Sequence, residues 1–177
     1  MNVMAMNILI APNSLKKTAN ATEAANAIER GLKKSMPDAR LTCMPIADGG
    51  EHTLEILTGH MAGEIVTCDT TGPTGGPVEA SYGILPDHTA VIELSKASGY
   101  ELLNGTDLNP LFTTTYGTGT MIKDALERGC RKILLTLGGS ATVDGGTGIL
   151  EALGVKFLDR ENRVIPPGGG NLLILDH

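Results

Sequence analysis

The feature that most constrains the fold is an order of segments that occurs three times along the chain. Each time, a short apolar run is followed by a loop and then by a segment whose apolar residues have helical spacing. The apolar runs span residues 7–11, 41–46 and 132–137. Strands that alternate with helices in this way are typical of α/β domains. The sequence therefore predicts the α/β class.

The loop after the third apolar run consists mostly of small residues. The run at 132–137 predicts a strand covered on both faces, and residues 148–153 predict a helix with Leu150 and Leu153 on one side. Glycine permits positive φ and a close approach of backbone N–H groups to an anion. The candidate phosphate-binding residues are Gly138, Gly139, Ser140, Thr142, Gly145 and Gly146. The sequence therefore predicts a phosphate loop here.

Asp144 is the acidic residue within this loop. A carboxylate beside a bound phosphate is unfavourable unless it holds a metal ion or takes up a proton. Asp144 is therefore a candidate catalytic residue and a candidate metal ligand. An aspartate just before an apolar helical run also commonly caps that helix, and the local sequence leaves this structural alternative open.

The loop after the second apolar run, Ala47-Asp-Gly-Gly-Glu51, has a similar character. Loops at the carboxyl ends of strands in an open α/β sheet converge on one crevice. Asp48 and Asp144 could meet there, either holding Mg²⁺ between them or dividing metal binding and proton transfer. The alternative is that Asp48 and Gly49 form an ordinary turn.

The loop after the first apolar run precedes a predicted helix at 21–35. It offers one hydroxyl group and two ammonium groups, from Ser14, Lys16 and Lys17. Such groups can neutralise a phosphoryl or carboxylate group. The alternative is that these lysines are only solvated.

Residues 67–80 are rich in Thr, Gly and Pro, which indicates a turn or a connection between domains. We therefore expect two domains, residues 1–66 and 67–177. Three further elements are predicted in the second domain: strands at 78–85 and 89–94 that could pair as a hairpin, and a helix at 116–128.

Composition argues against several classes of partner. The formal net charge is −6, no basic stripe is visible, and aromatic residues make up only 3% of the chain. These properties argue against nucleic acid and against an anionic membrane surface as partners. The first six residues lack a basic start and a sufficient apolar stretch, so we expect neither a signal peptide nor an anchor there. The three cysteines are widely spaced and suit free thiols in a reducing compartment, so we expect a cytoplasmic protein.

Five motifs, in this order, resemble those of the bacterial glycerate kinases. Three of them lie in the loops: Ala11-Pro-Asn-Ser-Leu-Lys16, Ala47-Asp-Gly-Gly-Glu-His-Thr53 and Gly138-Gly-Ser-Ala-Thr-Val-Asp-Gly-Gly146. The other two are residues 90–99 and 114–119. Asn13, His52 and Val143 stand where the family usually has Asp, Gly and Asn. The resemblance spans essentially the whole chain.

This resemblance implies phosphoryl transfer from ATP, with Mg²⁺, to D-glycerate. The implied product is 2-phosphoglycerate, with 3-phosphoglycerate as the other possibility. The loop at 138–146 would bind the nucleotide phosphates. The implied catalytic residues are Lys16, Asp48 and Asp144, the two aspartates also serving as metal ligands, and the implied substrate-binding residues are Ser14, Gly49 and Gly50.

The resemblance also implies two α/β domains, one of them a Rossmann-like or flavodoxin-like three-layer domain, with the active site in the cleft between them. Members of the family usually have about twice these 177 residues, and their second half contributes to the site. We therefore expect a truncated chain that associates with a C-terminal half or with a second copy. The alternative function is a catalytically silent fragment, or half of a split kinase, that only binds an anion or a partner.

Overall fold

The computed structural model describes residues 6–15, 18–105 and 108–176. The chain forms two compact units, Met1–Asp48 and Gly49–His177. This division lies earlier than the predicted boundary between residues 66 and 67, because helix α2 (Thr53–His60) belongs to the second unit. There Leu54 packs with Leu85 and Val91.

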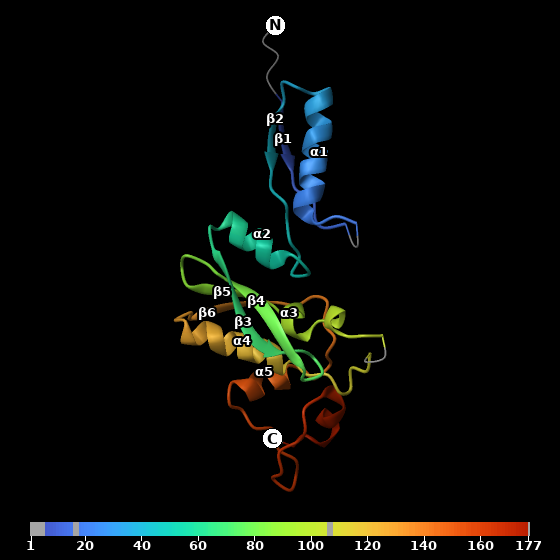
Figure 1. Ribbon diagram of the computed structural model, residues 1–177, viewed down its shortest axis with the longest axis vertical. Helices are drawn as coiled ribbons and strands as arrows, with labels where there is room; N and C mark the ends of the chain where they lie inside the picture. Colours follow the sequence, from blue (N-terminus) through green and yellow to red (C-terminus); the bar gives the residue numbers. More distant parts are fainter. Residues whose placement is uncertain (1–5, 16–17, 106–107, 177) are drawn as a thin grey trace. The chain divides into compact units, whose positions relative to one another are not determined.

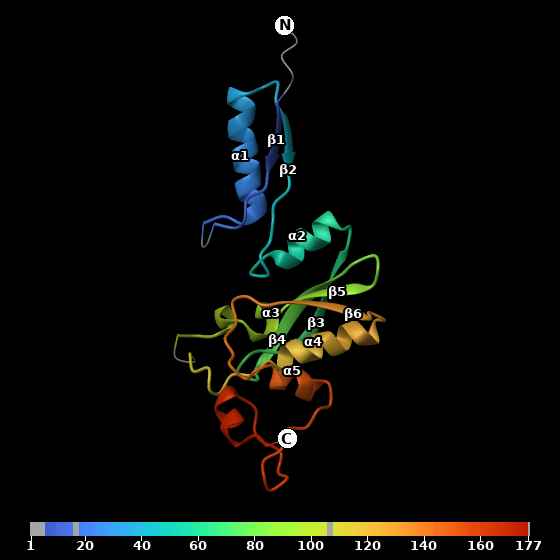
Figure 2. The same cartoon turned by 180° about the vertical axis from the view of Figure 1, so that it is seen from behind.

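The first unit contains strand β1 (Asn7–Ile10), helix α1 (Ala21–Ser35) and strand β2 (Arg40–Cys43). The two strands pair in parallel, with Asn7 opposite Arg40. Helix α1 lies along them in both views of the ribbon (Figures 1 and 2). Asn20 begins α1 with a capping box, in which the Asn20 side chain accepts from the Glu23 N–H and the Glu23 carboxylate accepts from the Asn20 N–H. The predicted strands and helix of this unit are confirmed.

The second unit is built on a sheet of four strands, β3 (Glu64–Thr71), β4 (Pro77–Ile84), β5 (Thr89–Glu93) and β6 (Lys132–Thr136), in that order across the sheet. Strands β3, β4 and β5 are antiparallel, whereas β5 and β6 are parallel. The predicted hairpin is confirmed. The turn predicted within residues 67–80 is present at 72–76, but the flanking residues pair between β3 and β4, so this segment is not a connection between domains.

Helices cover this sheet on both faces. They are α2, α3 (Ser95–Ser98), α4 (Tyr116–Glu127) and α5 (Thr147–Ala152), with 3₁₀ segments at Tyr100–Leu102 and Gly169–Ile174. On one face Tyr82 and Ile92 pack with Met121 of α4, while on the other Val91 packs with Leu54 of α2. Figure 1 shows α4 lying along the strands. The predicted α/β class is confirmed, and the side chains alternate between the two faces as the strand period requires.

One prediction about local burial is wrong. Strand β6 is not covered on both faces, since Ile133 and Leu135 pack against the core whereas Leu134 remains 44% exposed. The helix predicted at 148–153 is α5, in which Ile149 packs against the core; Leu150 and the C-cap residue Leu153 are both more than 40% exposed. Among the described residues, no helix is both long enough and apolar enough to cross a membrane.

Candidate functional site

Two of the predicted glycine loops touch in the second unit. A Cβ atom on Gly138 would lie 2.6 Å from the Cα of Gly50 and 3.0 Å from the carbonyl oxygen of Gly49. A real side chain does not tolerate such distances to backbone atoms, so this contact requires glycine at position 138. Gly49 itself has a φ of 91° and lies near the side chain of Thr136. The fold therefore brings Gly49, Gly50 and Gly138 together, as predicted from their motifs.

Backbone hydrogen bonds hold the first half of the predicted phosphate loop in place. The carbonyl oxygen of Gly139 accepts from the N–H of Tyr100 at 2.9 Å, and the N–H of Ala141 donates to Ser98 at 2.9 Å. Ser140, between them, forms a bridge with Gly99 and remains exposed. The Ser140 side chain is thus carried on a fixed backbone at the surface of the unit.

The second half of the loop leads into α5. Gly145 and Gly146 have φ angles of 62° and 81°, and Gly146 is the N-cap of the helix. A Cβ on Gly146 would meet no atom within 4 Å. Here glycine is favoured by the left-handed backbone rather than by a close neighbour. Thr142, ahead of this turn, is half-buried.

Asp144 lies at the centre of this turn and is almost fully buried, with 1% of its surface exposed. Its Oδ2 atom accepts hydrogen bonds from the N–H and the hydroxyl of Thr115, at 2.7 and 2.8 Å, and from the N–H of Gly148 at 3.3 Å. Oδ1 accepts from the N–H of Gly146 at 3.1 Å. These bonds join the start of α4 to the start of α5. They match the capping alternative, and they leave Asp144 poorly suited to direct metal binding.

Asp48 has a different environment in the first unit. Its side chain is exposed, and Oδ2 accepts a hydrogen bond of 3.0 Å from the Asn13 side chain. Asn13 also accepts from the N–H of Ser14 at 2.7 Å, so one amide orients both predicted site residues. Lys16 lies outside the described residues. Because Asp48 and Asp144 belong to different units, their meeting in one crevice stays a prediction.

A cavity of about 310 Å³ opens beside the glycine loops of the second unit. This volume is at the lower end of the range typical of small-molecule sites. The cavity is bounded by the two glycine loops and by the segment after β5; its lining includes His52, Gly139, Glu93, Ser95, Lys96 and Gly99. The cavity therefore lies where the strand ends and glycine loops were predicted to form a binding site.

Glu93 is the buried carboxylate of this cavity, with 1% of its surface exposed. Its Oε1 atom accepts a 2.7 Å hydrogen bond from the N–H of Leu54 at the start of α2, and its Oε2 atom lies 3.7 Å from Nζ of Lys96. Burial raises the pKa of the Glu93 carboxyl above its ordinary value, although the Leu54 N–H and the Lys96 ammonium oppose the rise. Lys96 also pairs with Glu55, at 3.2 Å.

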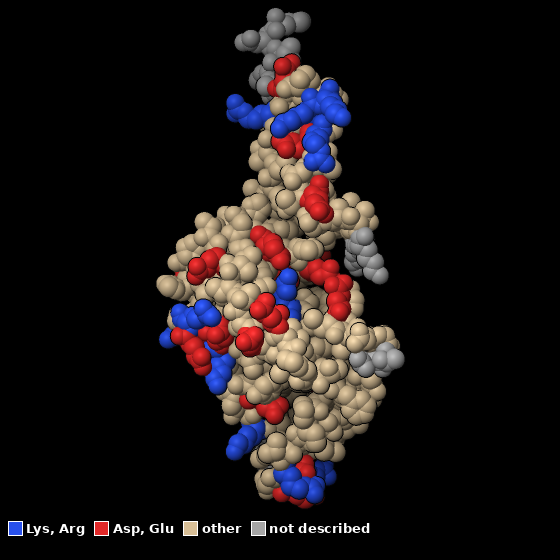
Figure 3. Space-filling view, in the orientation of Figure 1, with Lys and Arg blue, Asp and Glu red and all other residues tan. Residues whose placement is uncertain are grey.

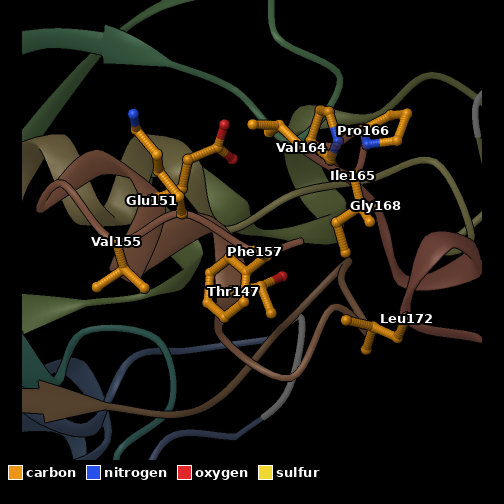
Figure 4. A pocket seen from close by; sticks show the side chains of 11 residues that line it. Thr147, Glu151, Val155, Phe157, Val164, Ile165, Pro166, Gly168 and Leu172 are labelled. Carbon is orange, nitrogen blue, oxygen red and sulfur yellow. The ribbon is translucent and has the colours of Figure 1, made fainter. Parts of the chain in front are cut away.

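A second, smaller cavity of about 50 Å³ lies between α5 and residues 155–172. Figure 4 shows Thr147 and Glu151 of α5 together with Phe157, and Leu172 nearby. The volume is too small for a three-carbon acid or a nucleotide, so this cavity is not a candidate substrate site.

The charged side chains of the described residues can be compared with what a metal centre or a basic surface would require. Within residues 6–15, 18–105 and 108–176, no group of three His, Cys, Asp or Glu side chains could hold a metal ion. On the face drawn in Figure 3, basic and acidic side chains of the described residues are interspersed rather than gathered into a basic stripe.

The sequence patterns did not indicate three residues that position candidate site residues: Asn13 in the first unit, and Glu93 and Thr115 in the second. Asn13 was noted only as a departure from the family motif. Glu93 ends an apolar strand, Ala90-Val-Ile-Glu93. A single charged residue in such a run indicates a buried side chain with a specific partner. Thr115 belongs to a run of threonines whose partner, Asp144, becomes evident only in the folded chain.

Comparison with known proteins gives consistent matches. The sequence model of the glycerate kinase family matches residues 8–177. A glycerate kinase of Bacillus subtilis is 48% identical over 168 residues, which are 94% of this chain and 44% of that protein. A glycerate 2-kinase of Escherichia coli K12 is 45% identical over 172 residues, covering 97% of this chain and 45% of that protein.

A solved structure agrees with these matches. The crystal structure of a Salmonella typhimurium LT2 protein assigned as glycerate kinase 2 superposes with a TM-score of 0.83 at 44% sequence identity. The superposition covers 98% of this chain and 46% of that one. The chain thus spans less than half the length of the relatives it matches.

Proposed function

Because the chain belongs to the glycerate kinase family, we propose that it supplies part of the active site of an enzyme that phosphorylates D-glycerate with ATP. The proposed product is 2-phosphoglycerate, in keeping with the name of the E. coli relative, and 3-phosphoglycerate is the other product to be tested. The proposed enzyme acts in the cytoplasm on this small acid, alone or in association with a further chain.

The observation that carries this proposal is the contact of Gly138 with Gly49 and Gly50. It joins the two motifs that resemble those of the family at the edge of a cavity large enough for a small acid. Phosphoryl transfer depends mainly on positioning the reactants and neutralising charge, which closely packed glycine loops favour.

We assign the roles as follows from the local geometry. The backbone N–H groups of Gly139 and Gly145 and the hydroxyls of Ser140 and Thr142 would bind phosphate oxygens, since these residues lie in the loop that ends at α5. Gly146 would shape the turn before α5, because its own N–H donates to Asp144. Asp144 would hold that loop in shape through its hydrogen bonds.

Residues of the first unit would contact glycerate. Ser14 and Lys16 would bind its carboxylate or the transferred phosphoryl group, and Asp48 would accept the hydroxyl proton or hold Mg²⁺. The exposed side chain of Asp48, oriented by Asn13, fits such a role better than the enclosed Asp144 does. Mg²⁺ would neutralise charge on the nucleotide phosphates.

The proposal is tested with two proteins: this chain, and a chimera in which residues 8–177 replace the matching segment of the B. subtilis glycerate kinase. Each is incubated with D-glycerate, ATP and Mg²⁺, and the product is identified by ³¹P NMR. We expect the chimera to form 2-phosphoglycerate, and Asp48→Asn to reduce its turnover strongly.

Two controls make the outcome decisive. L-glycerate in place of D-glycerate should give little product, and omission of Mg²⁺ should abolish turnover. A folded chimera that binds ATP but phosphorylates neither hydroxyl would contradict the proposed function. Turnover by the chimera but not by this chain would show that the remaining part of the relative is required.

A further inference from the structure

The segment from Glu93, the last residue of β5, to Tyr100 contacts both glycine loops of the second unit. It contains most of the motif at 90–99, to which the proposed reaction assigns no role. On one side it reaches the start of α2, directly after Gly49 and Gly50, and on the other it runs beside residues 136–141. The segment is therefore placed to set the position of one loop relative to the other.

Glu93 makes the contact with the first of these loops. Its carboxylate accepts from the N–H of Leu54, in the first turn of α2, at 2.7 Å. A helix begins with N–H groups that have no partner within the helix, and no side chain of the N-cap residue His52 supplies one here. Glu93 supplies that acceptor from β5, and so anchors the helix that follows Gly49 and Gly50.

Backbone hydrogen bonds make the contact with the second loop. Leu94 donates to Thr136 at 3.1 Å, Tyr100 donates to Gly139 at 2.9 Å, and Ser98 accepts from Ala141 at 2.9 Å. The Ser98 hydroxyl is in turn 2.8 Å from that of Thr118 in α4. This side of the segment does not depend on Glu93, because its bonds are formed by the main chain.

We infer that Glu93 is a positioning residue of the proposed kinase, which holds the Gly49–Gly50 loop against Gly138 by anchoring the N-terminus of α2. The expected effect on turnover rests on the proposed function. The anchoring of α2 by the bond between Leu54 and Glu93 does not depend on it. The side chain acts as a hydrogen-bond acceptor toward Leu54, so a neutral acceptor of the same length can replace it. Its negative charge is not required for this role.

The experiment compares Glu93→Gln, Glu93→Ala and the control Glu127→Ala, which alters an exposed glutamate at the end of α4. Hydrogen exchange of the Leu54 amide is measured by NMR in this chain. We expect Glu93→Ala to speed that exchange about tenfold or more, because a hydrogen bond to a charged group is lost. Glu93→Gln and the control should leave it nearly unchanged.

Kinetics in the B. subtilis chimera supply the second readout. Glu93→Ala should raise KM for D-glycerate and lower kcat/KM by about ten- to a hundredfold, since displacement of a site loop by about an ångström has effects of that size. A mere loss of folded enzyme would lower kcat and leave KM unchanged. Glu93→Gln should restore most of the activity.

The outcomes separate this inference from the proposed function. If Glu93→Gln is as inactive as Glu93→Ala while Leu54 stays protected, the carboxylate acts through its charge and the inference is overturned. Unchanged Leu54 exchange in a folded Glu93→Ala protein would also overturn it. If Glu93→Ala does not fold, Glu93→Gln is compared with the unmodified chain. The inference then requires that Glu93→Gln keeps both the protection of the Leu54 amide and most of the activity. An inactive unmodified chimera would count against the proposed function, whereas Leu54 exchange would still test the anchoring role.

Discussion

Two buried carboxylates of the second unit, Asp144 and Glu93, occupy similar places and differ in their partners. Each is 1% exposed and lies at the start of a helix. Asp144 accepts hydrogen bonds on both oxygens, from Thr115, Gly146 and Gly148. Glu93 accepts one bond from Leu54, and its other oxygen faces Lys96 beside the cavity. Asp144 is therefore enclosed by hydrogen-bond donors, whereas Glu93 has fewer donors and also borders a cavity.

The largest effect is expected when Asp144 is removed. Asp144→Ala leaves several buried N–H and O–H donors without an acceptor, so we expect a loss of about 3 kcal/mol or more in the free energy of unfolding. Urea denaturation followed by circular dichroism measures this loss. The control Asp69→Ala, at an exposed position of β3, should change the free energy by about 0.5 kcal/mol or less. Equal effects of the two variants would refute the capping role.

The contact between the glycine loops is tested by Gly138→Ala. The added methyl group would overlap the backbone of Gly49 and Gly50, and overpacking of this kind costs about 1–3 kcal/mol. The matched control is Gly59→Ala in α2, where a Cβ meets nothing within 4 Å. Because alanine favours a helix over glycine, the control should gain about 0.5–1 kcal/mol. Thermal unfolding of both variants measures the difference, and a stable Gly138→Ala protein would argue against the close approach.

The pH dependence of the free energy of unfolding tests whether burial raises the pKa of Glu93. Burial raises the pKa of Glu93 in the folded chain, so the folded state binds a proton more tightly than the unfolded state does. The resulting stabilisation is complete below the ordinary pKa and is lost as the pH rises through the raised value. Glu93→Gln cannot ionise and should lack this dependence. Urea denaturation of both proteins between acidic and neutral pH measures it, and a difference in stability that does not vary with pH would contradict the prediction.

The smallest effect is expected at Thr136, opposite Glu93 in the parallel pairing of β5 and β6. Among the described residues, its hydroxyl is the buried side-chain polar atom without a hydrogen-bond partner. Thr136→Val therefore removes an unsatisfied group and should be neutral or stabilising by up to about 1 kcal/mol. Thr115→Val, which removes a hydroxyl that donates to Asp144, should instead cost about 1–2 kcal/mol. Denaturation curves of the two valine variants compare the sites directly, and a clear loss of stability in Thr136→Val would contradict the assignment.

Local pattern predicted most elements and failed where pairing between distant segments decided the outcome. Residues 7–10 and 21–35 form the predicted strand and helix, because apolar spacing and an Asn–Glu capping box act within the segment itself. Residues 67–80 differ from the prediction, because their Thr, Gly and Pro content suggests a turn or a connection between domains. In the folded chain most of these residues pair between β3 and β4, and only the central part turns.

The sequence by itself determined the α/β class and the position of the glycine loops, because strand alternation, helical spacing and the absence of a Cβ atom are local properties. Its ordered motifs identified the family by resemblance. Only the tertiary structure decided how the acidic residues are used. It enclosed Asp144 among the donors of two helix ends, anchored α2 on Glu93 and packed Gly138 against Gly50. These roles depend on contacts between residues that are far apart in the sequence. Only the folded chain brings their donors, acceptors and backbone atoms close together.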